Sequence, residues 1–146
     1  MRLARLRALL AGLWAGQLLC VAALAAPNAF ATLERAQAGA YVGRLFSLDA
    51  TLSLALGLLL AMMARRLQRE ASPEGEGVRA MTPDLLLPLA ALFCTAAGYN
   101  ALQPMMEAAR AGQGALSFGA LHGISMLFFA AKTLAVLALA WLTARS

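Results

Sequence analysis

Charged residues are scarce in this chain, and their scarcity decides the class of protein. Only 13% of the 146 residues are charged and 62% are hydrophobic, which gives a mean hydropathy of +0.72. A soluble domain has about a quarter of its residues charged and roughly half apolar. This composition therefore predicts an integral membrane protein whose surface contacts the lipid bilayer.

The chain also lacks any cluster of basic residues. Its formal net charge is +5 and its pI is about 10.2, but the twelve basic residues are scattered along the sequence. Tracking a phosphate backbone needs lysines and arginines gathered on one face. The sequence therefore argues against a nucleic-acid partner, and the positive charges are better explained by membrane topology.

Cysteine and histidine are nearly absent. Cys20 and Cys94 both lie in apolar runs, which is typical of small buried hydrophobes and leaves soft-metal ligation as an alternative. His122 is the single histidine, so one chain cannot form a bis-histidine haem site. The sequence has no HExxH, phosphate-loop or CxxC motif and no nucleophilic triad. We therefore expect a protein that is not an enzyme and that has no resident cofactor or metal.

Four apolar runs are long enough to cross a hydrocarbon core of ~30 Å at 1.5 Å per residue. They cover about residues 8–26, 45–64, 85–106 and 118–142. The fold class predicted for 1–146 is thus an all-α membrane protein, a single four-helix transmembrane domain. Pro27 and Asn28 predict a break, followed by a short amphipathic segment at 28–44 that lies in the interface. The charged stretch 65–84 predicts a cytoplasmic linker loop.

The N-terminus has some features of a signal peptide. Arg2, Arg5 and Arg7 precede the first apolar run, and alanines near its end resemble a cleavage site. The run is longer than the roughly 7 to 15 residues of a signal-peptide core. We expect residues 1–26 to contain a retained spanning helix.

The arginines predict how the chain is oriented. Eight fall in the N-terminal tail, the linker and the C-terminal tail, against three in the two opposite connections. The first group is Arg2, Arg5, Arg7, Arg65, Arg66, Arg69, Arg79 and Arg145; the second is Arg35, Arg44 and Arg110. By the positive-inside rule, both termini lie in the cytoplasm of a bacterial-type inner membrane.

Small side chains form a stripe on the first helix. Ala8, Gly12, Gly16 and Cys20 recur every four residues, which lets another helix approach closely. We expect this face to be buried in the bundle, or to dock a second copy or a partner membrane helix through Gly12 and Gly16. Gln17 lies beside the stripe and is able to donate an interhelical hydrogen bond.

The last apolar run contains the most unusual residue. Lys132 lies in its middle, where a charge costs roughly 2.5 to 3.5 kcal/mol on insertion scales. Helical spacing puts His122 and Ser125 on the same face, with Lys132 about 15 Å deeper than His122. Together with Asp49 and Asn100 they predict a polar cavity that opens at the outer end.

The partner of Lys132 is not evident from the sequence. Asp49 is placed near the outer end of its predicted helix, where it would pair with His122. No acidic residue is then left at the depth of Lys132. Its ammonium would snorkel, or bind the hydroxyl of Ser53 or Thr95, a backbone carbonyl, another subunit or an anionic ligand.

The two hairpins of the predicted bundle resemble each other faintly. Proline, arginine and two glycines recur in the same order with offsets of 73 to 77 residues. The first set is Pro27, Arg35, Gly39 and Gly43; the second is Pro104, Arg110, Gly112 and Gly119. A duplication would be of the parallel kind, because both hairpins run in the same direction.

Three short motifs carry a family resemblance. They are Pro27-Asn28-Ala29-Phe30, the stretch 38–46 (AGAYVGRLF) and Leu121-His122-Gly123-Ile124-Ser125. Together they resemble the transmembrane protein 205-like family, also known as domain of unknown function 4149. The resemblance implies a small four-helix integral membrane protein and transfers no catalytic residues. The chain has Phe129 where members of that family often have an asparagine.

Three hypotheses of function follow. In the first, the protein transports a small ion or solute, or confers tolerance to it, through a polar cavity lined by Asp49, Asn100, His122, Ser125 and Lys132. The second alternative is a non-catalytic assembly or interaction module. The third is a haem- or copper-binding membrane protein that uses His122, with Met105 and Met106 as soft ligands for copper.

Overall fold

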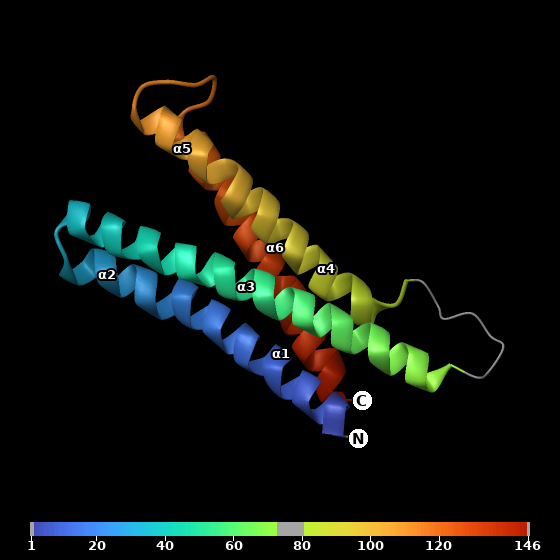
Figure 1. Ribbon diagram of the computed structural model, residues 1–146. Helices are drawn as coiled ribbons and strands as arrows, with labels where there is room; N and C mark the ends of the chain where they lie inside the picture. Colours follow the sequence, from blue (N-terminus) through green and yellow to red (C-terminus); the bar gives the residue numbers. More distant parts are fainter. Residues whose placement is uncertain (1, 73–80, 146) are drawn as a thin grey trace.

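The computed structural model describes residues 2–72 and 81–145. In this part of the chain all regular structure is helical, and four helical passes form two hairpins (Figure 1). The elements are α1 (Arg2–Cys20), η1 (Val21–Ala25), α2 (Ala26–Thr32), α3 (Arg35–Ala71), α4 (Pro83–Thr95), η2 (Ala96–Ala101), α5 (Leu102–Arg110) and α6 (Phe118–Arg145). Each pass is long and apolar enough to cross a membrane, so the predicted four-helix membrane fold is confirmed.

The first and third passes each contain a π-helical turn followed by a proline. Pro27 follows η1 and Pro104 follows η2, and neither ends its helix. A proline has no N–H to donate, and its ring collides with the carbonyl four residues earlier. Those carbonyls belong to Ala23 and Asn100, inside the wider π turns. The predicted break at Pro27 is therefore wrong, because the π turn accommodates the ring.

The second pass is one continuous helix. α3 runs from Arg35 to Ala71, so the separate interfacial segment predicted at 28–44 is wrong: its first part belongs to the first pass and the rest begins α3. The same helix takes in the start of the predicted linker, since Arg65–Ala71 continue α3. The middle of that linker, 73–80, lies outside the described residues.

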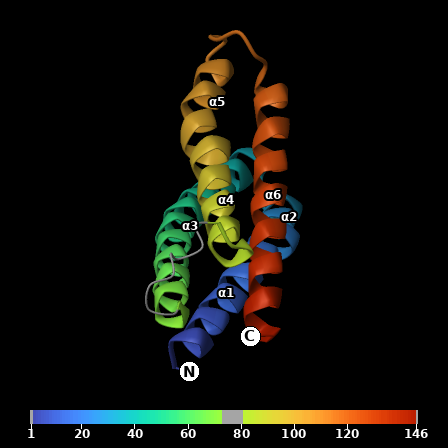
Figure 2. The same ribbon diagram turned by 90° about the vertical axis from the view of Figure 1, so that its right-hand side faces the viewer.

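The four passes form a ring in which α1, α3, α4 and α6 are successive neighbours. α3 and α6 therefore face each other across one diagonal, and α1 and α4 across the other. We call the end where α1 begins and α6 ends the base, and the two turns at the other end the tips (Figure 1). Among the described residues, α2 and α5 contact only elements of their own hairpin, so the hairpins diverge toward the tips (Figure 1). In the view of Figure 2 the tip between α5 and α6 rises above that between α2 and α3.

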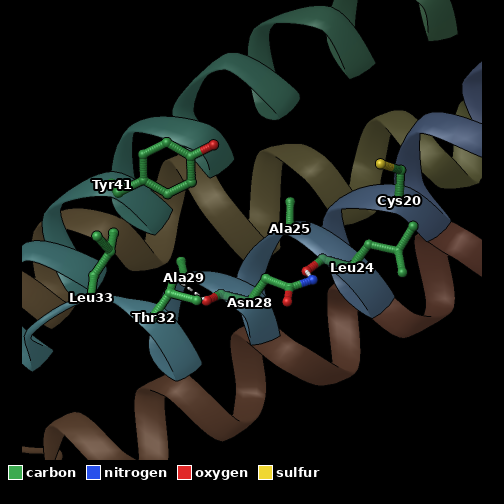
Figure 3. A pocket seen from close by; sticks show the side chains of 8 residues that line it. All are labelled: Cys20, Leu24, Ala25, Asn28, Ala29, Thr32, Leu33 and Tyr41. Carbon is green, nitrogen blue, oxygen red and sulfur yellow. Dashed lines mark hydrogen bonds between the residues drawn. The ribbon is translucent and has the colours of Figure 1, made fainter.

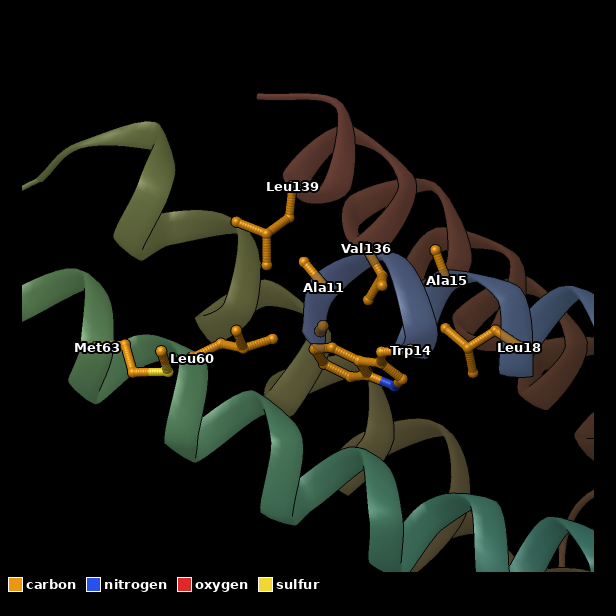
Figure 4. Packing of buried hydrophobic residues seen from close by; sticks show 9 residues of the cluster. Ala11, Trp14, Ala15, Leu18, Leu60, Met63, Val136 and Leu139 are labelled. Carbon is orange, nitrogen blue, oxygen red and sulfur yellow. The ribbon is translucent and has the colours of Figure 1, made fainter. Parts of the chain in front are cut away.

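The core lies in the base half of the bundle. Trp14 and Leu18 of α1 pack there with Leu60 of α3 and with Val136 and Leu139 of α6 (Figure 4). Each of these five side chains is fully buried. They come from three passes, so this cluster joins the two hairpins.

The stripe of small residues on α1 does not face this core. Gly12, Gly16 and Cys20 are exposed, and a Cβ added at either glycine would meet no atom within 4 Å. The prediction that this face is buried in the bundle is therefore wrong. The larger Trp14 and Leu18 fill the interior instead, since a wide space between helices needs side chains of their volume.

Candidate functional site

Lys132 forms an ion pair with Asp49 in the middle of the bundle. Lys132 Nζ lies 2.7 Å from Asp49 Oδ2, and the two residues are only 4% and 3% exposed. Asp49 lies on α3 and Lys132 on α6, so the pair crosses a diagonal of the bundle. The prediction that no acidic residue lies at the depth of Lys132 is wrong.

The error comes from where α3 begins. Asp49 and Lys132 each lie fourteen residues after the tip-side start of its helix, Arg35 and Phe118. At 1.5 Å per residue both are about 21 Å from those starts. A helix that begins at 45 would leave Asp49 near its end, whereas the continuous α3 carries it to the level of Lys132.

Other polar groups complete the network around the pair. Gln17 Nε2 donates a hydrogen bond of 2.7 Å to Asp49 Oδ1, so each carboxylate oxygen has a partner. Lys132 also donates to Ser53 Oγ at 3.3 Å, and Trp14 Nε1 donates to the same oxygen at 3.2 Å. Side chains of α1, α3 and α6 thus meet in one network. The roles expected for Gln17 and for the Ser53 hydroxyl are confirmed.

One atom at the edge of this network has no partner. Gln17 Oε1 is buried and accepts no hydrogen bond within the described chain. Thr95, the other hydroxyl considered for Lys132, donates instead to the carbonyl of Ala91 in its own helix at 2.8 Å. The ion pair therefore depends on α1, α3 and α6, and the Thr95 hydroxyl is used within α4.

Two aromatic rings cover the pair on the side of the tips. Lys132 Nζ lies 4.7 Å from the centre of the Phe129 ring, which is a cation–π contact. Phe46 packs edge-on against Phe129, with the ring centres 5.3 Å apart. Each phenylalanine lies three residues closer to the tips than the charged residue of its own helix. The pair is thus capped by apolar rings toward the tips and packed on the core toward the base.

The remaining predicted site residues lie closer to the tips. Ser125 Oγ donates a hydrogen bond of 2.7 Å to the carbonyl of Gly98 in η2. His122 is exposed and stacks on Phe118 with ring centres 5.7 Å apart. Asn100 is exposed as well. The expected pairing of His122 with Asp49 is wrong, because Gln17 and Lys132 bind that carboxylate.

Three side chains of this site were not predicted from the sequence. Trp14 packs in the core and also donates to Ser53. Phe46 and Phe129 were not assigned to the site, although each lies one turn from a charged residue on its own helix. That spacing on one helical face was the available signal.

Two hollows on the surface of the described chain are lined by none of the five predicted site residues. One of about 340 Å³ lies beside the first hairpin near its tip (Figure 3). Two of its polar side chains bond within the chain: Asn28 Nδ2 donates to the carbonyl of Leu24 at 2.9 Å, and Thr32 Oγ1 to that of Asn28 at 2.7 Å. The second hollow, of about 640 Å³, lies between α3 and α4 at the base.

The residues proposed as copper or haem ligands differ in their exposure. Met106 is buried, whereas Met105 and His122 are exposed. Within residues 2–72 and 81–145, no three His, Cys, Asp or Glu side chains gather closely enough to hold a metal ion. The described residues thus place no cluster of His, Cys, Asp or Glu ligands around His122.

Comparison with known proteins identifies the family. The model of the family described as "Domain of unknown function (DUF4149)" matches residues 9–115. The chain belongs to this family. No curated protein and no solved structure matches the chain. The family match includes Asp49, Gln17 and Ser53 and stops before α6, so the two halves of the ion pair lie on either side of its boundary.

Proposed function

We propose that this protein moves a small ion across the membrane, with the Asp49–Lys132 pair as the site that opens during transport. The observation that carries the proposal is the pair itself, held at 2.7 Å inside a bundle of membrane-spanning length. Ionisable residues at such depth are expensive and most often belong to ion pathways or proton relays. A purely structural role gives little reason to keep the charges, since apolar residues of similar volume stabilise a buried site as well or better.

The pair can be broken in two chemical ways. Protonation of Asp49 would release Lys132, and a small anion that binds Lys132 would release Asp49. Either event leaves an uncompensated buried charge or polar group, which favours a rearrangement of the helices that hold the partners. Because the two partners lie on opposite hairpins, such a rearrangement would change how the hairpins sit against each other.

The Phe46–Phe129 pair lies next to the ion pair on the side of the tips. Its rings lie one turn from the charges and between them and the diverging ends of the hairpins. Ser125, Asn100 and His122 lie still closer to the tips than the two rings, and Asn100 and His122 are exposed. We propose that this aromatic pair is the outer gate and that the outer polar groups are the route of approach.

A flux experiment tests this function. The protein is reconstituted in vesicles that contain a pH-sensitive dye or a chloride-sensitive dye, and a gradient of the matching ion is applied. We expect the wild type to dissipate one of the gradients, the double variant Asp49→Leu/Lys132→Met to lose that flux, and Phe129→Ala to increase it. The proposal fails if neither ion crosses wild-type vesicles faster than vesicles with the double variant.

The location in the cell belongs to the same proposal. The excess of arginine at the base, including Arg2, Arg5 and Arg69, supports a bacterial-type inner membrane with both termini in the cytoplasm. Protons or anions would then pass between the cytoplasm and the outside. No chemical conversion is part of this mechanism, so we propose a transporter and not an enzyme.

A second candidate function is assembly with other membrane helices. It is supported by the open face of α1, where Gly12 and Gly16 are exposed and have free space around them. Small residues in such a position let two helices approach closely in lipid. Gly12→Leu/Gly16→Leu should abolish an oligomer measured by light scattering in detergent, whereas Leu13→Phe, on another exposed part of α1, should not. An unchanged mass in both would exclude this function.

A further inference from the structure

The hollow at the base combines an apolar floor with a basic rim. Its floor consists of Ala61 and Met62 of α3 and Leu85 and Leu89 of α4. Its rim carries three arginines of the last turns of α3, namely Arg65, Arg66 and Arg69. The volume of about 640 Å³ is within the range of small-molecule sites.

The apolar and basic parts are separated along the membrane normal. Met62 belongs to the apolar run of α3 and Leu89 to that of α4, and their exposed fractions are 57% and 42%. The arginines begin directly after the apolar run of α3 ends at Ala64. The floor of the hollow thus lies at the level of acyl chains and the rim at the level of headgroups.

The rim keeps positive charge available. Arg66 Nε pairs with Glu70 at 2.9 Å, and both side chains are largely exposed. Arg65 Nη1 donates to Gln68 Oε1 at 3.5 Å. Arg69 is exposed and forms no hydrogen bond or ion pair with any described residue. Arg69 thus presents its guanidinium to solvent at the mouth of the hollow.

The N-terminus of α4 reaches the same hollow. The helix begins at Pro83, and Leu85 of its first turn lines the hollow. The partial positive charge of about half a unit at a helix N-terminus is opposed in this turn by the carboxylate of Asp84, which pairs with Arg7 of α1. The positive charge at the mouth of the hollow therefore comes from the arginines of α3.

We propose that this hollow binds an anionic phospholipid. The phosphate-bearing headgroup would lie on Arg69, and an acyl chain would lie along Met62 and Leu89. Charge complementarity and the order of the two parts along the membrane normal select this occupant, because a free anion would leave the apolar floor unused. The site is distinct from the Asp49–Lys132 pair and does not depend on the function proposed for it.

Lipid retention by the whole chain tests the proposal. The protein is purified in detergent and mixed with phosphatidylglycerol and phosphatidylcholine, and bound lipids are counted by native mass spectrometry. We expect phosphatidylglycerol to be retained preferentially. Arg69→Gln should lower its retention about fivefold, the effect of one basic residue near an anionic lipid surface, and Arg69→Lys should preserve most of it.

Arg5→Gln is the matched control. Arg5 is an exposed arginine at the base but lies on α1, outside the hollow, so its loss should leave retention unchanged. Equal retention of the two lipids, or equal losses in Arg5→Gln and Arg69→Gln, would overturn the proposal. A thermal stabilisation by millimolar inorganic phosphate as large as that by phosphatidylglycerol would assign the site to a free anion and would also overturn it.

Discussion

The environment of Lys132 shows how a membrane bundle tolerates a charged side chain. Its ammonium has one carboxylate partner, one hydroxyl partner and one aromatic face. The carboxylate of Asp49 is in turn bound on both oxygens. Removing charges from water costs several kcal/mol each, and only close pairing with further hydrogen bonds offsets that cost. The cost of burying either charge of the pair is therefore offset only while the other charge is present.

Substitution of one partner should be far more harmful than substitution of both. Lys132→Met leaves the Asp49 carboxylate buried without a counter-charge, and we expect a loss of about 3 to 5 kcal/mol in unfolding free energy. The double variant Asp49→Leu/Lys132→Met should regain most of this loss. Unfolding in mixed micelles with increasing denaturing detergent measures both. A double variant no more stable than the single one would contradict this account.

At the scale of elements, the π turns determine how closely the helices approach. η2 brings Gly98 against α6, where an added Cβ would lie 2.3 Å from Phe128 Cβ. The same glycine offers its carbonyl to Ser125. Because the opposing atom is bound directly to the backbone, it cannot move aside without moving α6. The glycine is thus required by the approach of two helices and not by its own backbone angles.

Gly98→Ala should therefore weaken the second hairpin. Over-packing of this kind costs typically about 1 to 3 kcal/mol, and the separation of the helices should also lengthen the bond from Ser125 to Gly98. Gly12→Ala is the control, since it meets no atom within 4 Å and should be neutral or stabilising by up to about 1 kcal/mol through helix propensity. Thermal unfolding in detergent distinguishes the two variants. Similar unfolding midpoints would show that α6 shifts to make room for the added methyl group at little cost.

The recurrence of a π turn before a proline in both hairpins bears on the predicted duplication. Pro27 and Pro104 lie at matching places in the first helical pass of each hairpin. The turns that follow differ, since Gly39 and Gly43 lie within α3, whereas Gly112 lies in the loop before α6 with φ of +73°. The duplication remains a prediction that this shared feature favours.

At the scale of the whole molecule, two ion pairs tie the two diagonals of the bundle. Asp49–Lys132 joins α3 to α6 in the middle, and Arg7–Asp84 joins α1 to α4 at the base, with 2.5 Å between Arg7 Nη2 and Asp84 Oδ1. The partners at the base are unequally buried: the side chain of Arg7 is 6% exposed and that of Asp84 is 46% exposed. Arg7 Nε is also buried without a partner in the described chain.

This inequality predicts an asymmetric response to substitution. Asp84→Ala leaves the buried guanidinium of Arg7 without a counter-charge. It should destabilise the protein more than Arg7→Met, which leaves the Asp84 carboxylate within reach of water. We expect a difference of about 1 to 2 kcal/mol in unfolding free energy between the two variants, since leaving a buried polar group unpaired costs about 1 to 3 kcal/mol. Detergent unfolding curves provide the comparison. Equal effects would mean that Arg7 reaches solvent in the membrane.

The orientation of the molecule can be tested by labelling. In a background with Cys20 and Cys94 replaced by alanine, Ala71→Cys at the base should react with a membrane-impermeant maleimide only after the cells are opened. Gln113→Cys at the tips should react in intact cells. Both replacement sites are exposed. The reverse pattern would place the termini outside and contradict the distribution of arginine.

Composition and hydropathy were enough to predict the class of the protein, the number of its spans and the cost of burying Lys132. These predictions follow from composition and from the length of the apolar runs. A run as long as the hydrocarbon core is thick has to cross it as a helix, because only a helix pairs all its backbone groups within the segment. The predicted start of the second pass at residue 45 was wrong, since α3 begins at Arg35. Charged residues such as Glu34 and Arg35 do not show whether a helix ends at the membrane surface or continues beyond it.

The contacts of Lys132 depend on how the four passes pack together. The register between α3 and α6, and the diagonal that brings Asp49 opposite it, result from the packing of Trp14, Leu60 and Val136 in the shared core. The burial of Trp14 and the exposure of Gly12 were decided in the same way, since both belong to an apolar run in which hydropathy does not distinguish lipid from protein. In a membrane, side-chain volume and polar pairing select the interior face of a helix.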